Sequence, residues 1–157
     1  MFCYSFFDRQ LIARGFDLRQ GREFLSLKDI SVADLDVEAV ESVTESMTGE
    51  DLVAHLRASH RTEAYVVNPQ GTLTGVVPIL TALANPDQTA SALIGDEYLV
   101  LHLSDDLQQA LGIARRFVGE AIPVVDEAGA LVGCLSEGAI LGGTLDRQEE
   151  VKGRERN

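Results

Sequence analysis

The positions of apolar and polar residues repeat one order of predicted elements twice along the chain. Alternating apolar residues predict a strand over residues 37–43 and another over residues 98–103. Each strand is followed by a polar, acidic start and then by apolar residues at helical spacing, as in an amphipathic helix. A short strand, a turn, a second strand and a short helix complete each copy. The short strands before the turns and the final helices are predicted at 64–67 and 79–84 in the first copy, and at 121–125 and 137–141 in the second.

The two copies align without a gap when the sequence is shifted by 58 residues. Residues 66–75 then lie over residues 124–133, with identical Val, Val, Gly, Leu and Gly, and Asn68 over Asp126 matches in turn chemistry. Residues 85–87, Asn-Pro-Asp, separate the copies. Two copies are too few for a solenoid, and they predict a pseudo-symmetric pair of mixed α and β units.

Composition narrows the classes of function. The chain has 157 residues, of which 45% are hydrophobic, and a formal net charge of −12. The apolar content suits a packed core, and the negative charge argues against nucleic acid, whose phosphates attract basic surfaces. Cys3 and Cys134 lack the spacing of zinc ligands, and no phosphate-loop or nucleophile motif is present. We therefore expect a protein that is not an enzyme and that holds no metal ion.

The first residues differ from the rest of the chain. Residues 1–7 hold four of the nine aromatic residues, but the run is too short to span a bilayer, which takes about 20 apolar residues. Residues 1–28 carry five Lys or Arg against three acidic residues, in a chain that is otherwise acidic. A basic excess beside an apolar end is typical of a cytoplasmic membrane exit and equally of a solvated helix face. Charge alone leaves both interpretations open.

A tandem β-α-β-β-α unit with the pattern V-V-N/D-x-x-G-x-L-x-G in each copy resembles the CBS domain pair, or Bateman module. The second copy is the closer match, since residues 120–126 look like the family's P-V-V-D strand and turn. The first copy has Tyr65 where Pro is usual. The resemblance implies an α/β (α+β) fold of two packed pseudo-symmetric repeats, preceded by a short helix and linker. The expected divisions are a membrane-helix end and linker over 1–29, repeats over 30–85 and 86–145, and a charged tail over 146–157.

Residues 5–23 resemble the end of the last membrane helix and the linker of CLC-type chloride channels and transporters. In that family the linker leads directly into a cytosolic CBS pair. The resemblance implies a regulatory domain on the cytoplasmic face of the cell membrane, in a voltage-gated chloride channel or a chloride/proton antiporter. It would modulate gating, transport and dimer assembly. Its partners would be the membrane domain of the same polypeptide and a second copy in a homodimer, with chloride as the transported ion. The fragment itself is expected to be soluble.

A stand-alone CBS pair that senses an adenine nucleotide and regulates another protein is the alternative hypothesis. CBS pairs often hold such nucleotides between the two copies, and Thr81 and Ala139 stand where the family's ribose-binding Asp is usual. Losing that acceptor weakens binding by roughly tenfold to a hundredfold, so an adenine nucleotide is expected to bind weakly and no other cofactor is expected. For Ser136, a plain helix N-cap is the alternative to a phosphate ligand. The candidate ligand contacts are Val40, Thr62, Gly119, Glu120 and Ser136.

Overall fold

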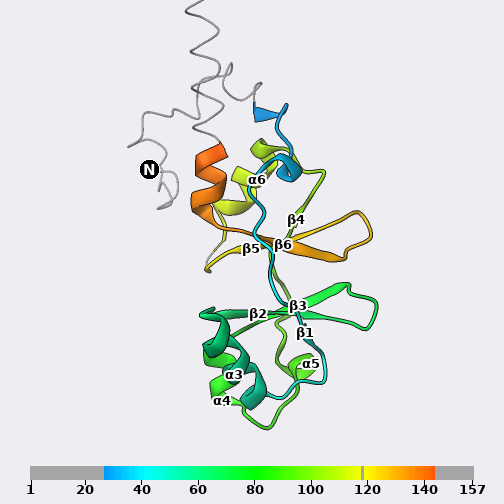
Figure 1. The fold of residues 1–157 in the computed structure, drawn as a ribbon, viewed down its shortest axis with the longest axis vertical. Helices are drawn as coiled ribbons and strands as arrows, with labels where there is room; N and C mark the ends of the chain where they lie inside the picture. The colour runs from blue at the N-terminus through cyan, green and yellow to red at the C-terminus, as the bar shows by residue number, and fades with distance from the viewer. Residues whose placement is uncertain (1–26, 118, 144–157) are drawn as a thin grey trace, which may run out of the picture.

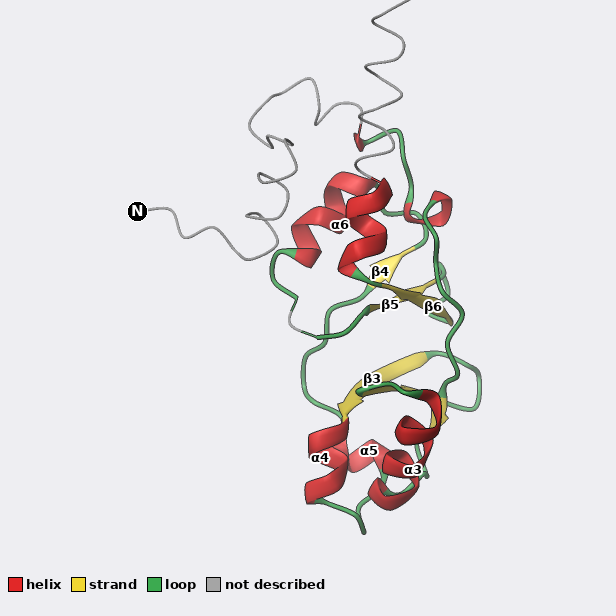
Figure 2. Ribbon diagram, turned by 60° about the vertical axis from the view of Figure 1, so that its left-hand side comes forward, coloured by secondary structure: helices red, strands yellow, loops and turns green. Residues whose placement is uncertain are grey.

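Two three-stranded sheets face each other at the centre of the molecule, with helices on the outer side of each (Figures 1 and 2). The computed structural model describes residues 27–117 and 119–143. In both sheets the first strand pairs parallel with the second, which pairs antiparallel with the third. The strands are β1 (Val43–Thr44), β2 (Glu63–Val67) and β3 (Leu73–Pro78) in the first half, and β4 (Leu101–His102), β5 (Ile122–Val125) and β6 (Leu131–Leu135) in the second.

The helices begin where the sequence places hydroxyl and acidic side chains. Before α3, the Thr48 hydroxyl oxygen accepts a hydrogen bond from the N–H of Asp51 at 3.3 Å, and before α6, Asp106 forms a capping box with Gln109. Both arrangements satisfy backbone donors of the first turn. The helices are η1 (Val32–Asp34, a 3-10 turn), α3 (Gly49–Ser59), α4 (Ile79–Ala84), α5 (Ala90–Leu93), α6 (Leu107–Ala114) and a helix whose described part covers residues 137–143.

The two hairpin turns meet each other at the middle of the molecule. Gly71 and Gly129 both have a φ of 84°, a backbone conformation that favours glycine. The N–H of Leu73 donates to the carbonyl oxygen of Gly129 at 3.0 Å, and the N–H of Leu131 donates to that of Gly71 at 3.2 Å. These two hydrogen bonds exchange partners under the 58-residue shift, so the sequence repeat is a pseudo-twofold symmetry of the fold.

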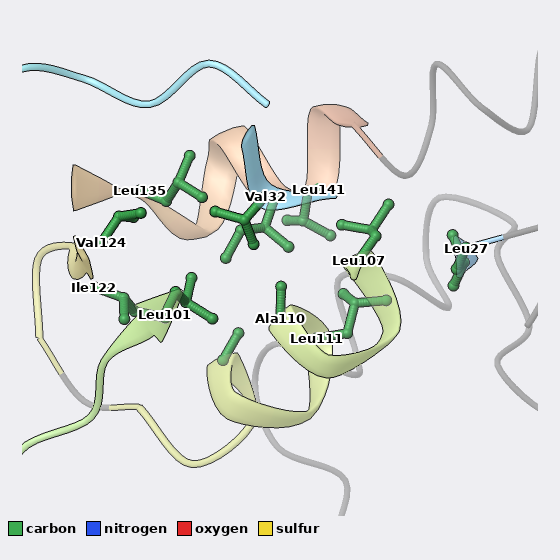
Figure 3. Close-up of a cluster of buried hydrophobic side chains, with 12 residues drawn as sticks. Leu27, Val32, Leu101, Leu107, Ala110, Leu111, Ile122, Val124, Leu135 and Leu141 are labelled. Atoms are coloured by element: carbon green, nitrogen blue, oxygen red, sulfur yellow. The ribbon is translucent and has the colours of Figure 1, made fainter. Parts of the chain in front are cut away.

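Each half has its own apolar core, and a third cluster lies between the two sheets. Figure 3 shows the second-half core, in which the side chains of Leu101, Ala110 and Leu135 point toward Val32. The first-half core gathers around Leu52 and Leu56 of α3. The cluster between the sheets comprises Tyr65, Leu73, Ala121, Val125 and Cys134.

Each half is completed by the segment that leads into the other half. The N–H of Val32 donates to the carbonyl oxygen of Asp105 at 2.7 Å, and the equivalent N–H of Ala90 donates to that of Met47, also at 2.7 Å. Val32 is therefore buried in the second-half core and Ala90 in the first-half core. The two halves therefore exchange their leading segments. The repeat boundaries predicted at residues 30 and 86 follow the sequence repeat, and they stay a prediction.

The predicted α/β (α+β) pair of β-α-β-β-α repeats is confirmed. The strands predicted over 37–43 and 98–103 are longer than the observed β1 and β4. In the first of these segments, Glu38 pairs instead with Cys134 of β6. Most of the predicted linker and the charged tail lie outside the described residues. Within residues 27–117 and 119–143, no helix has the length and apolar character needed to cross a membrane.

Candidate functional site

Three of the predicted contact residues come together beside the pseudo-twofold axis. The N–H and the hydroxyl of Thr62 both donate to Oε2 of Glu120, at 2.9 and 2.8 Å. Positions 62 and 120 are equivalent under the 58-residue shift, so this contact joins the same point of the two repeats. Gly119 lies against Glu63, because a Cβ atom at Gly119 would lie 2.7 Å from Oε1 of Glu63 and 2.6 Å from the ring of Phe117.

The pKa values of two neighbouring carboxylates, Glu120 and Glu63, are shifted in opposite directions. The pKa of Glu120 is lowered, chiefly because the backbone N–H and then the hydroxyl of Thr62 donate to its carboxylate. The pKa of Glu63 is raised because burial disfavours its charged form, and this effect exceeds that of the hydrogen bond from the Glu120 backbone. Thr62 therefore favours the ionised form of Glu120, whereas burial favours the neutral form of Glu63.

Two other predicted contacts, Val40 and Ser136, have different surroundings. Val40 packs against the apolar cluster between the sheets, next to Tyr65 and Cys134. The hydroxyl oxygen of Ser136 accepts a hydrogen bond from the N–H of Ala139 at 3.1 Å, which is the geometry of a helix N-cap. A ligand role for either residue stays a prediction.

Tyr65 belongs to the cluster against which Val40 packs, and Arg61 contacts Cys134 of the same cluster. The Tyr65 ring is 2% exposed, and its hydroxyl donates to the carbonyl oxygen of Ala121 at 2.9 Å. The Arg61 guanidinium bonds Oε1 of Glu38 at 2.9 Å and Sγ of Cys134 at 3.5 Å. Burial raises the pKa of the Cys134 thiol, although the Arg61 charge opposes this. We call these residues, Val40, Arg61, Tyr65 and Cys134, the Tyr65 side.

A cavity of about 900 Å³ lies on the opposite side of the pseudo-twofold axis, and we call it the open cleft. The shift of 58 residues relates two residues of the Tyr65 side, Val40 and Tyr65, to Tyr98 and Pro123. It relates Ser136 to Pro78 in the same way, and all three equivalents line the cavity. Sequence reasoning missed these residues, and applying the repeat to each candidate contact could have found them. The lining residues are Glu63, Val76, Pro78, Thr81, Leu93, Gly95, Asp96, Glu97, Tyr98, Leu99, Arg116, Phe117 and Pro123.

The open cleft and the Tyr65 side also differ in one backbone pairing. On the Tyr65 side, the N–H of Glu38 donates to the carbonyl oxygen of Cys134 and the N–H of Cys134 donates to that of Glu38, both at 2.9 Å. The equivalent pair would join Asp96 to Val76. No such bridge forms among the described residues, and both residues line the cavity instead.

The chain folds as a CBS domain pair. Residues 90–144 match the family model of the CBS domain. A CBS domain pair/ACT domain protein from Thermotoga maritima superposes with a TM-score of 0.65 at 24% sequence identity, over 74% of this chain and 98% of that one. The same level of identity is found for CBSX2 in complex with AMP, with a TM-score of 0.62 over 76% of this chain and 98% of that one.

Two longer proteins also contain a region similar to this CBS pair. The cytosolic domain of the Mg²⁺ channel MgtE, in complex with ATP, matches with a TM-score of 0.65 and 24% identity, over 85% of this chain and 57% of that one. A homoserine O-acetyltransferase of Methanohalophilus mahii is 27% identical over 117 residues, which are 73% of this chain. The match spans 24% of the acetyltransferase, about a quarter of its length.

Proposed function

We propose that this CBS pair is the cytosolic regulatory domain of a CLC-type chloride channel or chloride/proton antiporter. It lies on the cytoplasmic face of the membrane and biases gating through the segment that precedes it. One observation carries the proposal. Residues 27–38, the segment that leads into the first half, are attached to the second half of the pair. CBS domains are regulatory modules, and one similar structure is the cytosolic domain of a channel protein, which supports this role.

The leading segment is fastened by both apolar packing and backbone hydrogen bonds. Leu27 and Val32 are 1% and 0% exposed in the second-half core. The N–H of Leu107 at the start of α6 donates to the carbonyl oxygen of Ile30 at 2.8 Å, and Glu38 pairs with Cys134 of β6. A shift of the second half therefore displaces the chain at residue 27. A domain that transmits such a shift needs only different contacts in two states.

Exposed leucines on α4 support the homodimer that this proposal includes. Leu80 is 75% exposed and Leu83 is 48% exposed. Their equivalents under the 58-residue shift are Gly138 and the buried Leu141. Within residues 27–117 and 119–143, the pair of exposed leucines on α4 therefore has no counterpart at the equivalent positions of the second half. Two copies of this short helix face packed together would remove both leucines from water.

The test is made on the native polypeptide in its source cells. An antibody to this domain is expected to detect a band much larger than 17.0 kDa in the membrane fraction, and deletion of residues 30–143 is expected to alter chloride flux or membrane level. A band of the chain's own mass in the soluble fraction would overturn the proposal. Unchanged flux and membrane level after the deletion would overturn it as well.

The open cleft supports a second candidate function, a CBS pair that senses an adenine nucleotide. Its volume lies within the range of small-molecule sites. Thr81 offers a hydroxyl, Glu63 an acceptor for ribose hydroxyls, and Arg116 a cation for a phosphate. Calorimetry with millimolar adenine nucleotide is expected to show heat of binding, and heat equal to that of dilution would exclude this function.

A further inference from the structure

The open cleft and the Tyr65 side carry different charges at equivalent positions. On the Tyr65 side, the guanidinium of Arg61 donates to Oε1 of Glu38 at 2.9 Å, so this carboxylate has a cationic partner. Under the 58-residue shift, Asp96 corresponds to Glu38, but Gly119 stands where the first repeat has Arg61. Asp96 lines the open cleft. At these positions the second repeat therefore keeps the carboxylate and has no guanidinium to pair with it.

Two further carboxylates add to this difference. Glu63 and Glu97 also line the open cleft, and in both cases the equivalent residue in the other repeat is alanine. Three carboxylates thus line the described part of the cleft with one guanidinium, that of Arg116. Among the described residues, no ion pair is found at Asp96 or Glu97. A cavity lined by an excess of negative charge attracts a ligand of net positive charge.

The backbone at Gly119 shows where a side chain equivalent to Arg61 would lie. A Cβ atom at Gly119 would be 2.7 Å from Oε1 of Glu63 and 2.6 Å from the Phe117 ring, and both of these residues line the open cleft. A planar guanidinium group bonds carboxylates through its fork of N–H donors and stacks on aromatic faces. The position that Arg61 takes in one repeat therefore points, in the other repeat, at a carboxylate and an aromatic ring of the cleft.

The remaining charges of the cleft suit the other groups of an amino acid. The guanidinium of Arg116 is a partner for a ligand carboxylate, and a carboxylate of the lining is a partner for a ligand ammonium group. Arginine carries all three groups, and its net positive charge is opposite to that of the cleft. The cavity of about 900 Å³ has room for a molecule of this size.

We propose that the open cleft binds a free basic amino acid, with arginine as the best-fitting member of this class. The ligand guanidinium lies beside Glu63 and Asp96, and the ligand carboxylate lies at Arg116. This inference goes beyond both functions proposed above, because neither assigns a cationic ligand to the chain. The cavity, its excess of carboxylates and the guanidinium bound by Glu38 at the equivalent position support it together.

Titration calorimetry of the whole chain with L-arginine and L-citrulline tests the ligand class. Citrulline has nearly the same shape but carries an uncharged ureido group in place of the guanidinium. The chain is expected to bind one arginine, and to bind citrulline at least about tenfold more weakly, because charge-assisted hydrogen bonds are lost. No heat with millimolar arginine, or equal affinities for the two compounds, would overturn the proposal. These titrations contain no nucleotide, so their result is distinct from that of the nucleotide test.

A matched pair of variants tests the location of the site. Asp96→Asn removes one carboxylate of the cleft and is expected to weaken arginine binding at least about tenfold. Asp87→Asn removes the same charge from an exposed residue that does not line the cleft, and it is expected to leave the affinity unchanged. Equal affinities of the two variants for arginine would overturn the assignment of the ligand to the open cleft.

Substitutions at Gly119 test the equivalence with Arg61. Gly119→Arg supplies the guanidinium from the chain itself, and Gly119→Gln is its uncharged control. The atoms nearest the added Cβ belong to the ends of the Glu63 and Phe117 side chains, which can turn away. Gly119→Arg is expected to lose arginine binding and, without ligand, to unfold at a higher urea concentration than Gly119→Gln, since its guanidinium meets the carboxylates of the cleft. Retained arginine binding in Gly119→Arg, or equal unfolding midpoints of the two variants, would overturn the proposal.

Discussion

Glu63 and Glu120 lie close together but respond to pH in opposite directions. The first is half-buried, with a raised pKa, and the second accepts two hydrogen bonds from Thr62, with a lowered pKa. A raised pKa in the folded state means that the charged form of Glu63 destabilises the fold. A lowered pKa means that the charged form of Glu120 stabilises it. The same residue type therefore has opposite effects within one site.

Neutralising each glutamate tests this difference. Glu120→Gln is expected to lower the free energy of unfolding at pH 7 by about 1 kcal/mol, an effect present above the ordinary pKa and lost as the pH falls through the lowered one. Glu63→Gln is expected to raise the free energy of unfolding at neutral pH. That gain should shrink as the pH falls through the raised pKa toward the ordinary one, since wild-type Glu63 is then protonated too. Urea unfolding from about pH 3 to pH 8 measures both, and parallel pH profiles would contradict the account.

At the scale of elements, the start of α3 packs against the backbone at the end of α4, and this close contact fixes how the two helices meet. Gly49, the first residue of α3, is buried against the carbonyl groups of Ala82 and Asn85. A Cβ atom there would lie 2.8 Å from the Ala82 oxygen and even nearer to that of Asn85. Because both neighbours are backbone atoms, neither can turn away. The approach of α3 to α4 thus depends on one glycine.

Two glycine-to-alanine variants measure this effect. Gly49→Ala is expected to lower the free energy of unfolding by about 2–3 kcal/mol, since the new methyl group forces the two helices apart. Gly112→Ala in α6 is the matched control, because its added Cβ would have no atom within 4 Å apart from its chain neighbours and the backbone of its own helix. The control is expected to raise stability by about 0.5–1 kcal/mol. Equal effects of the two substitutions in chemical denaturation would show that the contact at Gly49 is unimportant.

At the scale of the whole molecule, the repeat in the sequence predicted the pseudo-symmetry but not its exceptions. The 58-residue shift gave the order of elements, and the contact of Thr62 with Glu120 follows from it. The sequence shows that Tyr65 stands where the second repeat has Pro123. It does not show whether the Tyr65 ring points into or out of the molecule, because that depends on tertiary packing. The exchange of leading segments was equally hidden, because η1 is short and its pairing partners lie about 70 residues away.

The exchanged segment is the part of the fold through which we proposed that the pair acts on a membrane domain. Val32 is fully buried in the second-half core, and the next residue, Ala33, is exposed. An aspartate at position 32 would place a carboxylate in an apolar core and detach the segment, whereas the same residue at position 33 would face water. Val32→Asp and Ala33→Asp therefore add the same charge, but only Val32→Asp disturbs the attachment of the segment.

The most direct measurement is chloride flux through the full-length polypeptide in proteoliposomes, at matched protein levels. Val32→Asp is expected to shift the flux or its gating by at least about threefold, which corresponds to a change of roughly 0.6 kcal/mol in the coupling between domains. Ala33→Asp is expected to leave both at the wild-type value. Equal flux in wild type and Val32→Asp, or no chloride flux from the intact polypeptide, would contradict the account.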